Sequence, residues 1–109
     1  MDSAATDAPV VSDNPAASRY ELHVGTELAG FVDYRLDERD KVISLVHTEV
    51  EPAFRHDHLA TSLARFSLDD ARGRGLAVLP YCPYITSWIR KHPEYADLVP
   101  ADRRGDFGI

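Results

Sequence analysis

Residues whose types and spacing suit chemistry concentrate in the segment 50–60, which reads V-E-P-A-F-R-H-D-H-L-A. The segment follows an apolar strand pattern and opens an amphipathic helix pattern, so a strand is expected to lead directly into a helix. Such a junction leaves backbone N–H groups at the helix start without partners, and the helix dipole makes them suitable for a phosphate or pyrophosphate. Arg55 and the backbone of residues 56–60 are the predicted anion-binding groups. The alternative is an ordinary turn with a solvated Arg55 and a helix cap at Asp57.

Three other side chains have types suited to proton or group transfer. Cys82 follows a predicted strand, and a thiol in that position acts as a nucleophile when a neighbour lowers its pKa. His47 and Glu49 are candidate neighbours, because residues two apart on a strand share a face. The alternative for Cys82 is a small buried hydrophobic residue, which is common for a free cysteine. For Glu49 the alternative is an outward-facing polar position.

The histidines on either side of Asp57 also suggest a metal site. His56 and His58 are two residues apart in a predicted loop. Two histidines without a third ligand at a recognisable spacing are a weak signal for a metal. We therefore expect no metal here.

The first elements that must position these residues are three strands. Alternating apolar side chains predict strands at 19–24 and 28–36, and a longer apolar run predicts a third strand at 41–50. Polar or Gly-containing turns of a few residues separate them. Because the connections are short, we expect an antiparallel three-stranded meander.

The pattern then becomes helical over 59–72, with Leu59, Ala60, Leu63, Ala64, Ser67 and Ala71 on one side. An apolar strand at 76–81 is expected to lie parallel to 41–50, followed by a short helix at 85–91. The aromatic residues expected to close the core over this last helix are Trp88 and Tyr95. The result is an α+β fold in which the carboxyl ends of two strands form a crevice beside the start of the first helix, where open sheets commonly bind ligands.

Length and composition indicate one domain with loose ends. A chain of 109 residues is too short to split into two domains. Residues 1–18 are rich in Ala, Asp, Ser and Pro and are expected to be a disordered tail. Residues 101–109 are charged and contain Gly, so they are expected to be flexible. The folded domain is therefore predicted to span 19–100.

Charge and cysteine content exclude several classes of protein. The formal net charge of −6 argues against nonspecific binding of nucleic acid. The chain lacks the apolar run of a signal peptide and a segment long enough to span a membrane, so no membrane partner is expected. A single cysteine excludes an internal disulfide framework and favours a reducing cytoplasm.

Three segments together resemble a known family. They are H-T-E-V-E-P-A-F-R at 47–55, Y-C-P-Y at 81–84 and R-K-H-P-E-Y at 90–95. This combination resembles the small single-domain branch of the GNAT superfamily of acetyl-CoA-dependent N-acetyltransferases, over residues 19–99. The resemblance implies a GNAT-like (acyl-CoA N-acyltransferase) fold. It also implies that the strands at 41–50 and 76–81 splay apart, so that the pantetheine arm of coenzyme A enters the gap.

The resemblance further implies transfer of an acetyl group from acetyl-CoA to a primary amine, which is either a small amine or a lysine side chain. The residues implied to bind the coenzyme are Thr48, Val50, Arg55, His56, Asp57, His58, Leu59 and Ala60. Glu49, or His47 in its place, is the implied general base, and Cys82 lies near the acetyl group. Direct attack by the amine is the usual chemistry, and a covalent acetyl-cysteine is the alternative. So short a chain implies a shallow acceptor site, in a monomer or a weak homodimer.

The sequence departs from the family pattern at two points. The coenzyme loop of the superfamily reads Q/R-x-x-G-x-G/A, whereas this chain has His58 in place of a glycine and His56 in place of a second. A Cβ obstructs close approach of a phosphate to the backbone. The tyrosine that protonates the departing thiolate in many members corresponds to Ile89 in this chain. Tyr84 and Tyr95 are nearby in the sequence but do not align with that position. The rival hypothesis is therefore a GNAT-shaped module that transfers little or no acetyl and binds coenzyme A or a protein partner.

Overall fold

The structure, a computed structural model, describes residues 8–57 and 59–109, with only the backbone described at 55–57. The strands are β1 (Pro9–Asn14), β2 (Arg19–Val24), β3 (Glu27–Asp37), β4 (Val42–Val50) and β5 (Ala77–Pro80). The α-helices are α1 (Leu59–Gly73) and α2 (Pro83–Lys91). The 3-10 helices are η2 (Pro15–Ala17), η3 (Pro52–Asp57), η4 (Pro93–Leu98) and η5 (Arg104–Phe107). Within the described residues this is an α+β fold, as the sequence predicted.

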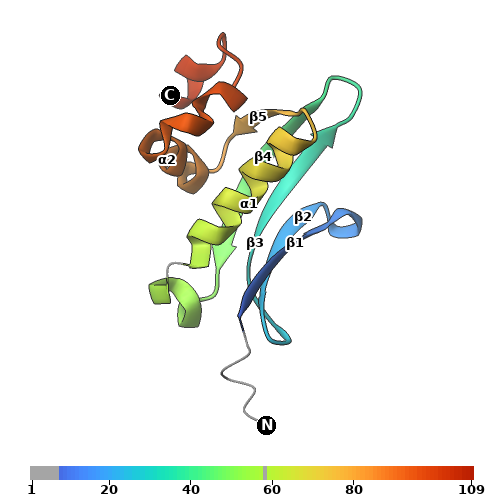
Figure 1. The fold of residues 1–109 in the computed structure, drawn as a ribbon, viewed down its shortest axis with the longest axis vertical. Coiled ribbons are helices and arrows are strands. Elements are labelled where there is room, and N and C mark those ends of the chain that lie inside the picture. Colours follow the sequence, from blue (N-terminus) through green and yellow to red (C-terminus); the bar gives the residue numbers. More distant parts are fainter. Residues whose placement is uncertain (1–7, 58) are drawn as a thin grey trace.

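The strands form one mixed sheet in the order β1-β2-β3-β4-β5, counted over the described part of the chain. The pairs β1–β2, β2–β3 and β3–β4 are antiparallel, and β4–β5 is parallel. A parallel neighbour needs a crossover connection, which α1 provides. The helix α1 lies across one face of the sheet, and α2 and the C-terminal residues gather at one end of the molecule (Figure 1).

The core lies between α1 and the sheet. The buried side chains of α1 are Leu63, Ala64, Ser67, Leu68 and Ala71, close to the predicted face. The sheet contributes Tyr20, Leu22, Val32, Ile43, Leu45 and Val78, which are fully buried. Trp88 and Tyr95 are also buried, which confirms their predicted place in the core.

Local signals define the ends of the helices. Gly75 follows α1 with a φ of +69°, a conformation that ends helices at low energetic cost when the residue is glycine. Pro83 occupies the first turn of α2, where its missing N–H removes no hydrogen bond. The two helices have 15 and 9 residues. In the part of the chain that the structure describes, none of the helices has the length and apolar character needed to cross a bilayer.

The expectation of a disordered tail up to residue 18 is wrong for residues 9–17. Residues 9–14 form β1 along the edge of β2, and Val11 packs against the core. Asp13 accepts a hydrogen bond of 2.7 Å from the Tyr34 hydroxyl and lies 3.6 Å from the Arg74 guanidinium. These partners are distant in sequence, so the local composition of the segment does not reveal them.

Residues 101–109, expected to be flexible, pack against α2 and η4 as a C-terminal segment. The Arg104 side chain donates to the carbonyl oxygens of Ala96 and Val99, at 3.2 and 2.9 Å. Phe107 and Ile109 are partly buried against the core. A charged, Gly-containing sequence is ordered here because Arg104 finds main-chain carbonyl partners and Phe107 and Ile109 pack against the core.

Candidate active site

The central feature of the candidate active site is the point where β4 and β5 part. Their parallel pairing runs from Val42 opposite Ala77 to Leu45 opposite Pro80. One further hydrogen bond joins the Cys82 N–H to the Leu45 carbonyl at 3.0 Å. Because β5 ends at Pro80 while β4 continues to Val50, the last part of β4 pairs, within the described strands, with β3 alone.

A β-bulge at this point determines which way the β4 backbone faces. The β3–β4 register shifts between Asp33 and Tyr34, which pair with His47 and Leu45. Beyond the bulge, the Glu51 N–H donates to the Ala29 carbonyl of β3 at 2.8 Å. Backbone groups of alternate residues point to opposite sides of a strand. The N–H and C=O of Thr48 therefore point away from β3, toward the gap beyond the end of β5.

A cavity of about 260 Å³, the active-site cavity, opens beside this gap. Its lining comes from the end of β4, the first turn of α1 and the first turn of α2. The lining residues are Thr48, Glu49, Val50, Ala60 and Tyr84. Of the predicted coenzyme residues, Thr48, Val50 and Ala60 thus share one cavity.

Gly30 of β3 permits the close packing behind this cavity. A Cβ at Gly30 would lie 2.7 Å from the Glu49 carbonyl oxygen and 3.2 Å from Leu63 of α1. The first distance is too short for a real Cβ contact with backbone. The absence of a side chain at this position therefore sets how closely β3, β4 and α1 approach one another.

Cys82 is buried, with 3% of its surface exposed. Its sulfur lies 2.8 Å from the Thr48 hydroxyl oxygen. His47 and Glu49, by contrast, pair with each other, with 3.0 Å between His47 Nε2 and Glu49 Oε1, and both side chains are about half exposed. Since side chains alternate along a strand, Thr48 points to the opposite face of the sheet from this pair. The expectation that His47 and Glu49 share a face is confirmed, but the hydrogen-bonding neighbour of Cys82 is Thr48.

The predicted phosphate loop is only partly described. The backbone of Arg55, His56 and Asp57 belongs to η3, and Leu59 begins α1. The side chains of residues 55–57 and the whole of His58 lie outside the described residues. Their predicted roles toward phosphate remain predictions. Elsewhere in the described chain, no group of three metal-ligating side chains comes together.

Tyr84, which does not align with the family's tyrosine in the sequence, nevertheless lies at the site. It lines the active-site cavity, whereas Ile89, at the expected tyrosine position, is fully buried. Tyr95 is occupied elsewhere, because its hydroxyl donates to Asp69 at 2.8 Å. Burial and that hydrogen bond raise the pKa of Tyr95. The sequence signal that could have identified Tyr84 is the preceding proline. Pro83 begins α2 two residues earlier than predicted, which places Tyr84 in the first turn, at the cavity.

One comparison with known proteins bears on this geometry. A family model described as GCN5-related N-acetyl-transferase matches residues 19–98. The match covers most of the chain and includes β4, α1, β5 and α2, which carry the parting strands and the cavity. The chain therefore belongs to the GCN5-related N-acetyltransferase (GNAT) family, whose members transfer acetyl groups.

Proposed function

We propose that this protein is an acetyl-CoA-dependent N-acetyltransferase that acts on a primary amine, either a small amine or a lysine side chain. The observation that carries the proposal is the active-site cavity at the parting of β4 and β5, with Thr48 facing it. Membership of the family supports acetyl transfer as the reaction class.

The residues around the gap fit the narrow end of coenzyme A. A cavity of about 260 Å³ accommodates a slender thioester arm, not an entire coenzyme. The short side chain of Ala60 keeps the cavity open at the start of α1, and the Thr48 backbone offers hydrogen-bonding groups to an amide-containing arm. Bound acetyl-CoA would supply an acetyl group activated as a thioester. Leu59 and residues 55–58 are proposed to hold the pyrophosphate beyond this cavity.

Glu49 is the proposed general base. Glu49 is one of the cavity-lining residues, and its half-exposed carboxylate, on the opposite face of the sheet from the Thr48 side chain, can accept the proton that the amine loses as it attacks. His47 is hydrogen-bonded to Glu49 and provides a second proton-accepting site on the same face. Tyr84 is the proposed donor of a proton to the departing thiolate, because its side chain lines the same cavity.

Direct attack by the amine is the proposed route, and Cys82 is proposed only to pack beside the Thr48 hydroxyl, without taking up the acetyl group. An activated cysteine nucleophile needs a base or a positive charge beside the thiol. The partner of Cys82 is the neutral hydroxyl of Thr48, and the thiol is buried. If the route is direct, a Cys82→Ala variant retains transfer within about threefold. Loss of transfer with the fold intact would favour the covalent route instead.

A second candidate function is binding of coenzyme A without efficient transfer. The observation that favours it is the buried Ile89 at the position of the usual tyrosine acid. Replacing both His56 and His58 by glycine tests whether these side chains weaken the binding of acetyl-CoA at the loop. A rise in acetyl-CoA affinity of about tenfold, or about 1.4 kcal/mol, would show that the histidines weaken a phosphate site.

A cytoplasmic location is also proposed, because the single cysteine of the chain is free and forms no disulfide.

The first test is a titration with acetyl-CoA followed by backbone amide NMR shifts. We expect shifts centred on Thr48, Ala60 and Tyr84. An Ala60→Leu variant should bind about tenfold more weakly because it fills the cavity, whereas the exposed Ala101→Leu should bind normally. The absence of shifts at millimolar acetyl-CoA would overturn both candidate functions. Binding without acetylation across a panel of primary amines would leave the second.

A further inference from the structure

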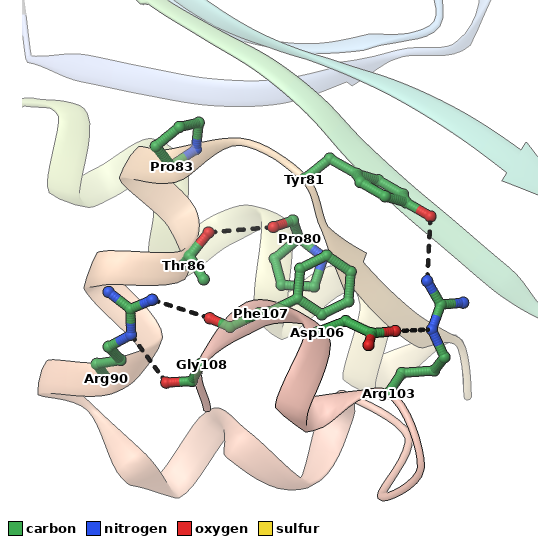
Figure 2. Close-up of a pocket in the computed structure, with 9 residues that line it drawn as sticks. All are labelled: Pro80, Tyr81, Pro83, Thr86, Arg90, Arg103, Asp106, Phe107 and Gly108. Carbon is green, nitrogen blue, oxygen red and sulfur yellow. Dashed lines mark hydrogen bonds and ion pairs between the residues drawn. The ribbon is translucent and has the colours of Figure 1, made fainter.

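A larger cavity, the C-terminal pocket, lies outside the active site. It has a volume of about 670 Å³ and sits between the end of β5, one face of α2 and the C-terminal segment (Figure 2). Pockets of this size commonly hold small organic ligands. The lining residues are Pro80, Tyr81, Pro83, Thr86, Arg90, Arg103, Asp106, Phe107 and Gly108.

The C-terminal pocket is on a different side of α2 from the active-site cavity. Successive helical residues are about 100° apart, so Thr86 and Arg90 lie about 200° and 240° from Tyr84 around the axis. The two residues that precede α2 are likewise on different sides. Tyr81 is 51% exposed and lines the C-terminal pocket, whereas Cys82 is buried beside Thr48. The pocket is therefore a separate site.

Arg90 supplies an uncompensated positive charge with a fixed position. Its Nε donates to the Gly108 carbonyl and its Nη2 to the Phe107 carbonyl, both at 2.9 Å. Among the described residues, no carboxylate lies within ion-pair distance of Arg90. The fork to two carbonyls orients the guanidinium without neutralising it, so its positive charge remains available to an anion at the pocket.

The other arginine of the pocket is already paired. Arg103 Nε lies 2.7 Å from the Asp106 carboxylate, and its Nη2 lies 3.4 Å from the Tyr81 hydroxyl. The charged side chains of the lining thus carry one net positive charge, that of Arg90. This is notable in a chain whose formal net charge is −6.

Apolar side chains form the remaining wall. The Phe107 ring packs edge-on to Tyr81, with 5.3 Å between ring centroids, and Figure 2 shows it in the middle of the pocket beside Pro80. A ligand that satisfies both parts needs an anionic head and an apolar body. We propose that the C-terminal pocket binds small organic carboxylates, with the carboxylate at Arg90 and the apolar body against Phe107 and Pro83. This inference does not depend on the acetyltransferase activity.

The test compares two ligands of nearly the same shape. Benzoate and its neutral analogue benzamide are titrated against the whole protein at low salt, with amide NMR as the readout. We expect benzoate to shift the amides of Tyr81, Arg90 and Phe107, and benzamide to bind at least about fivefold more weakly. Equal binding of the two ligands, or shifts centred on Thr48 and Tyr84, would overturn the proposal.

Variants test the role of Arg90 itself. Arg90→Gln should lower benzoate affinity at least about fivefold, and Arg90→Lys, which keeps the charge, should retain it within about threefold. Arg72→Gln is the matched control, because Arg72 also joins a helix to a later segment through Asp97 and the Glu94 carbonyl. The Ile109 amide reports whether the C-terminal segment stays packed in each variant. Unchanged benzoate binding in Arg90→Gln, or equal losses in Arg90→Gln and Arg90→Lys with the segment packed, would overturn the proposal.

Discussion

The active-site cavity and the C-terminal pocket lie on either side of the same short segment, Tyr81–Tyr84, and they are built in different ways. The active-site cavity depends on the backbone, because a bulge in β4 and the early end of β5 open the gap that Thr48 faces. The C-terminal pocket depends on side chains, because Arg90 fastens the C-terminal segment through two main-chain carbonyls.

Their charges differ as well. Glu49 is the acidic residue of the active-site cavity, whereas Arg90 leaves the C-terminal pocket net positive. An acidic rim suits an amine, and a fixed guanidinium suits a carboxylate. Just beyond the end of β5, Tyr81 lines the C-terminal pocket whereas the adjacent Cys82 is buried beside Thr48, so neighbouring residues belong to surroundings of different charge.

The largest effect is expected from Glu49→Gln. If Glu49 is the general base, this variant lowers the rate of acetyl transfer at least about 100-fold, while benzoate binding in the C-terminal pocket is unchanged. Steady-state assays with a primary amine measure the rate, with Glu38→Gln, in the exposed β3–β4 turn, as the control. A rate within threefold of the parent would remove Glu49 from this role.

The next effect is expected from Gly30→Ala. The added Cβ would meet the Glu49 carbonyl at 2.7 Å, so β4 must shift. We expect a loss of about 1–3 kcal/mol in the free energy of unfolding, together with weaker acetyl-CoA binding. Urea denaturation measures the stability. Gly73→Ala, where a Cβ meets nothing within 4 Å, should lack this penalty. Equal stability of the two variants would contradict the close packing of β3 and β4.

A smaller effect that separates the two cavities is expected from Gly108→Ala. Gly108 has a φ of +68°, and a Cβ there would lie 2.8 Å from Arg90 Nη2. The strain, about 1–2 kcal/mol for a residue with a Cβ in this conformation, should loosen the C-terminal segment and weaken benzoate binding severalfold. Gly105→Ala is the control, because the space around it is open. Weakened acetyl-CoA binding in Gly108→Ala would mean that the two cavities are not independent.

The smallest effect concerns acid stability in β2, two strands from Glu49. The hydrogen bond from Arg19 holds the pKa of Glu21 below its ordinary value of 4.5, and a second hydrogen bond, from Asn14 of β1, adds to it. A lowered folded-state pKa stabilises the fold above the unfolded pKa, and this contribution is lost as the pH falls through the folded value. The stability difference between the parent and Glu21→Gln should therefore shrink from about pH 6 to about pH 3. Denaturation curves at several pH values test this, and a constant difference would show that Glu21 does not titrate with folding.

Much of the fold could be predicted because its signals are local. Alternation in β2, β3 and β4 and the helical period of α1 each arise within a few residues, and the apolar face of α1 is buried as predicted. The family could also be predicted, because its motifs lie in three short segments that the matching model spans. Thr48, Val50 and Ala60 were placed in one site for the same reason.

What the sequence alone could not reveal depends on partners that are distant along the chain. The order in β1 and in the C-terminal segment comes from hydrogen bonds to Tyr34, Ala96 and Val99, which no local pattern encodes. A one-residue bulge in β4 decides that Thr48, and not Glu49, meets Cys82, because each shift of one residue reverses the face of the strand. Sequence thus determined the elements and the family, whereas the tertiary structure decided which side chains share a cavity, since that depends on register and on contacts between segments far apart in the chain.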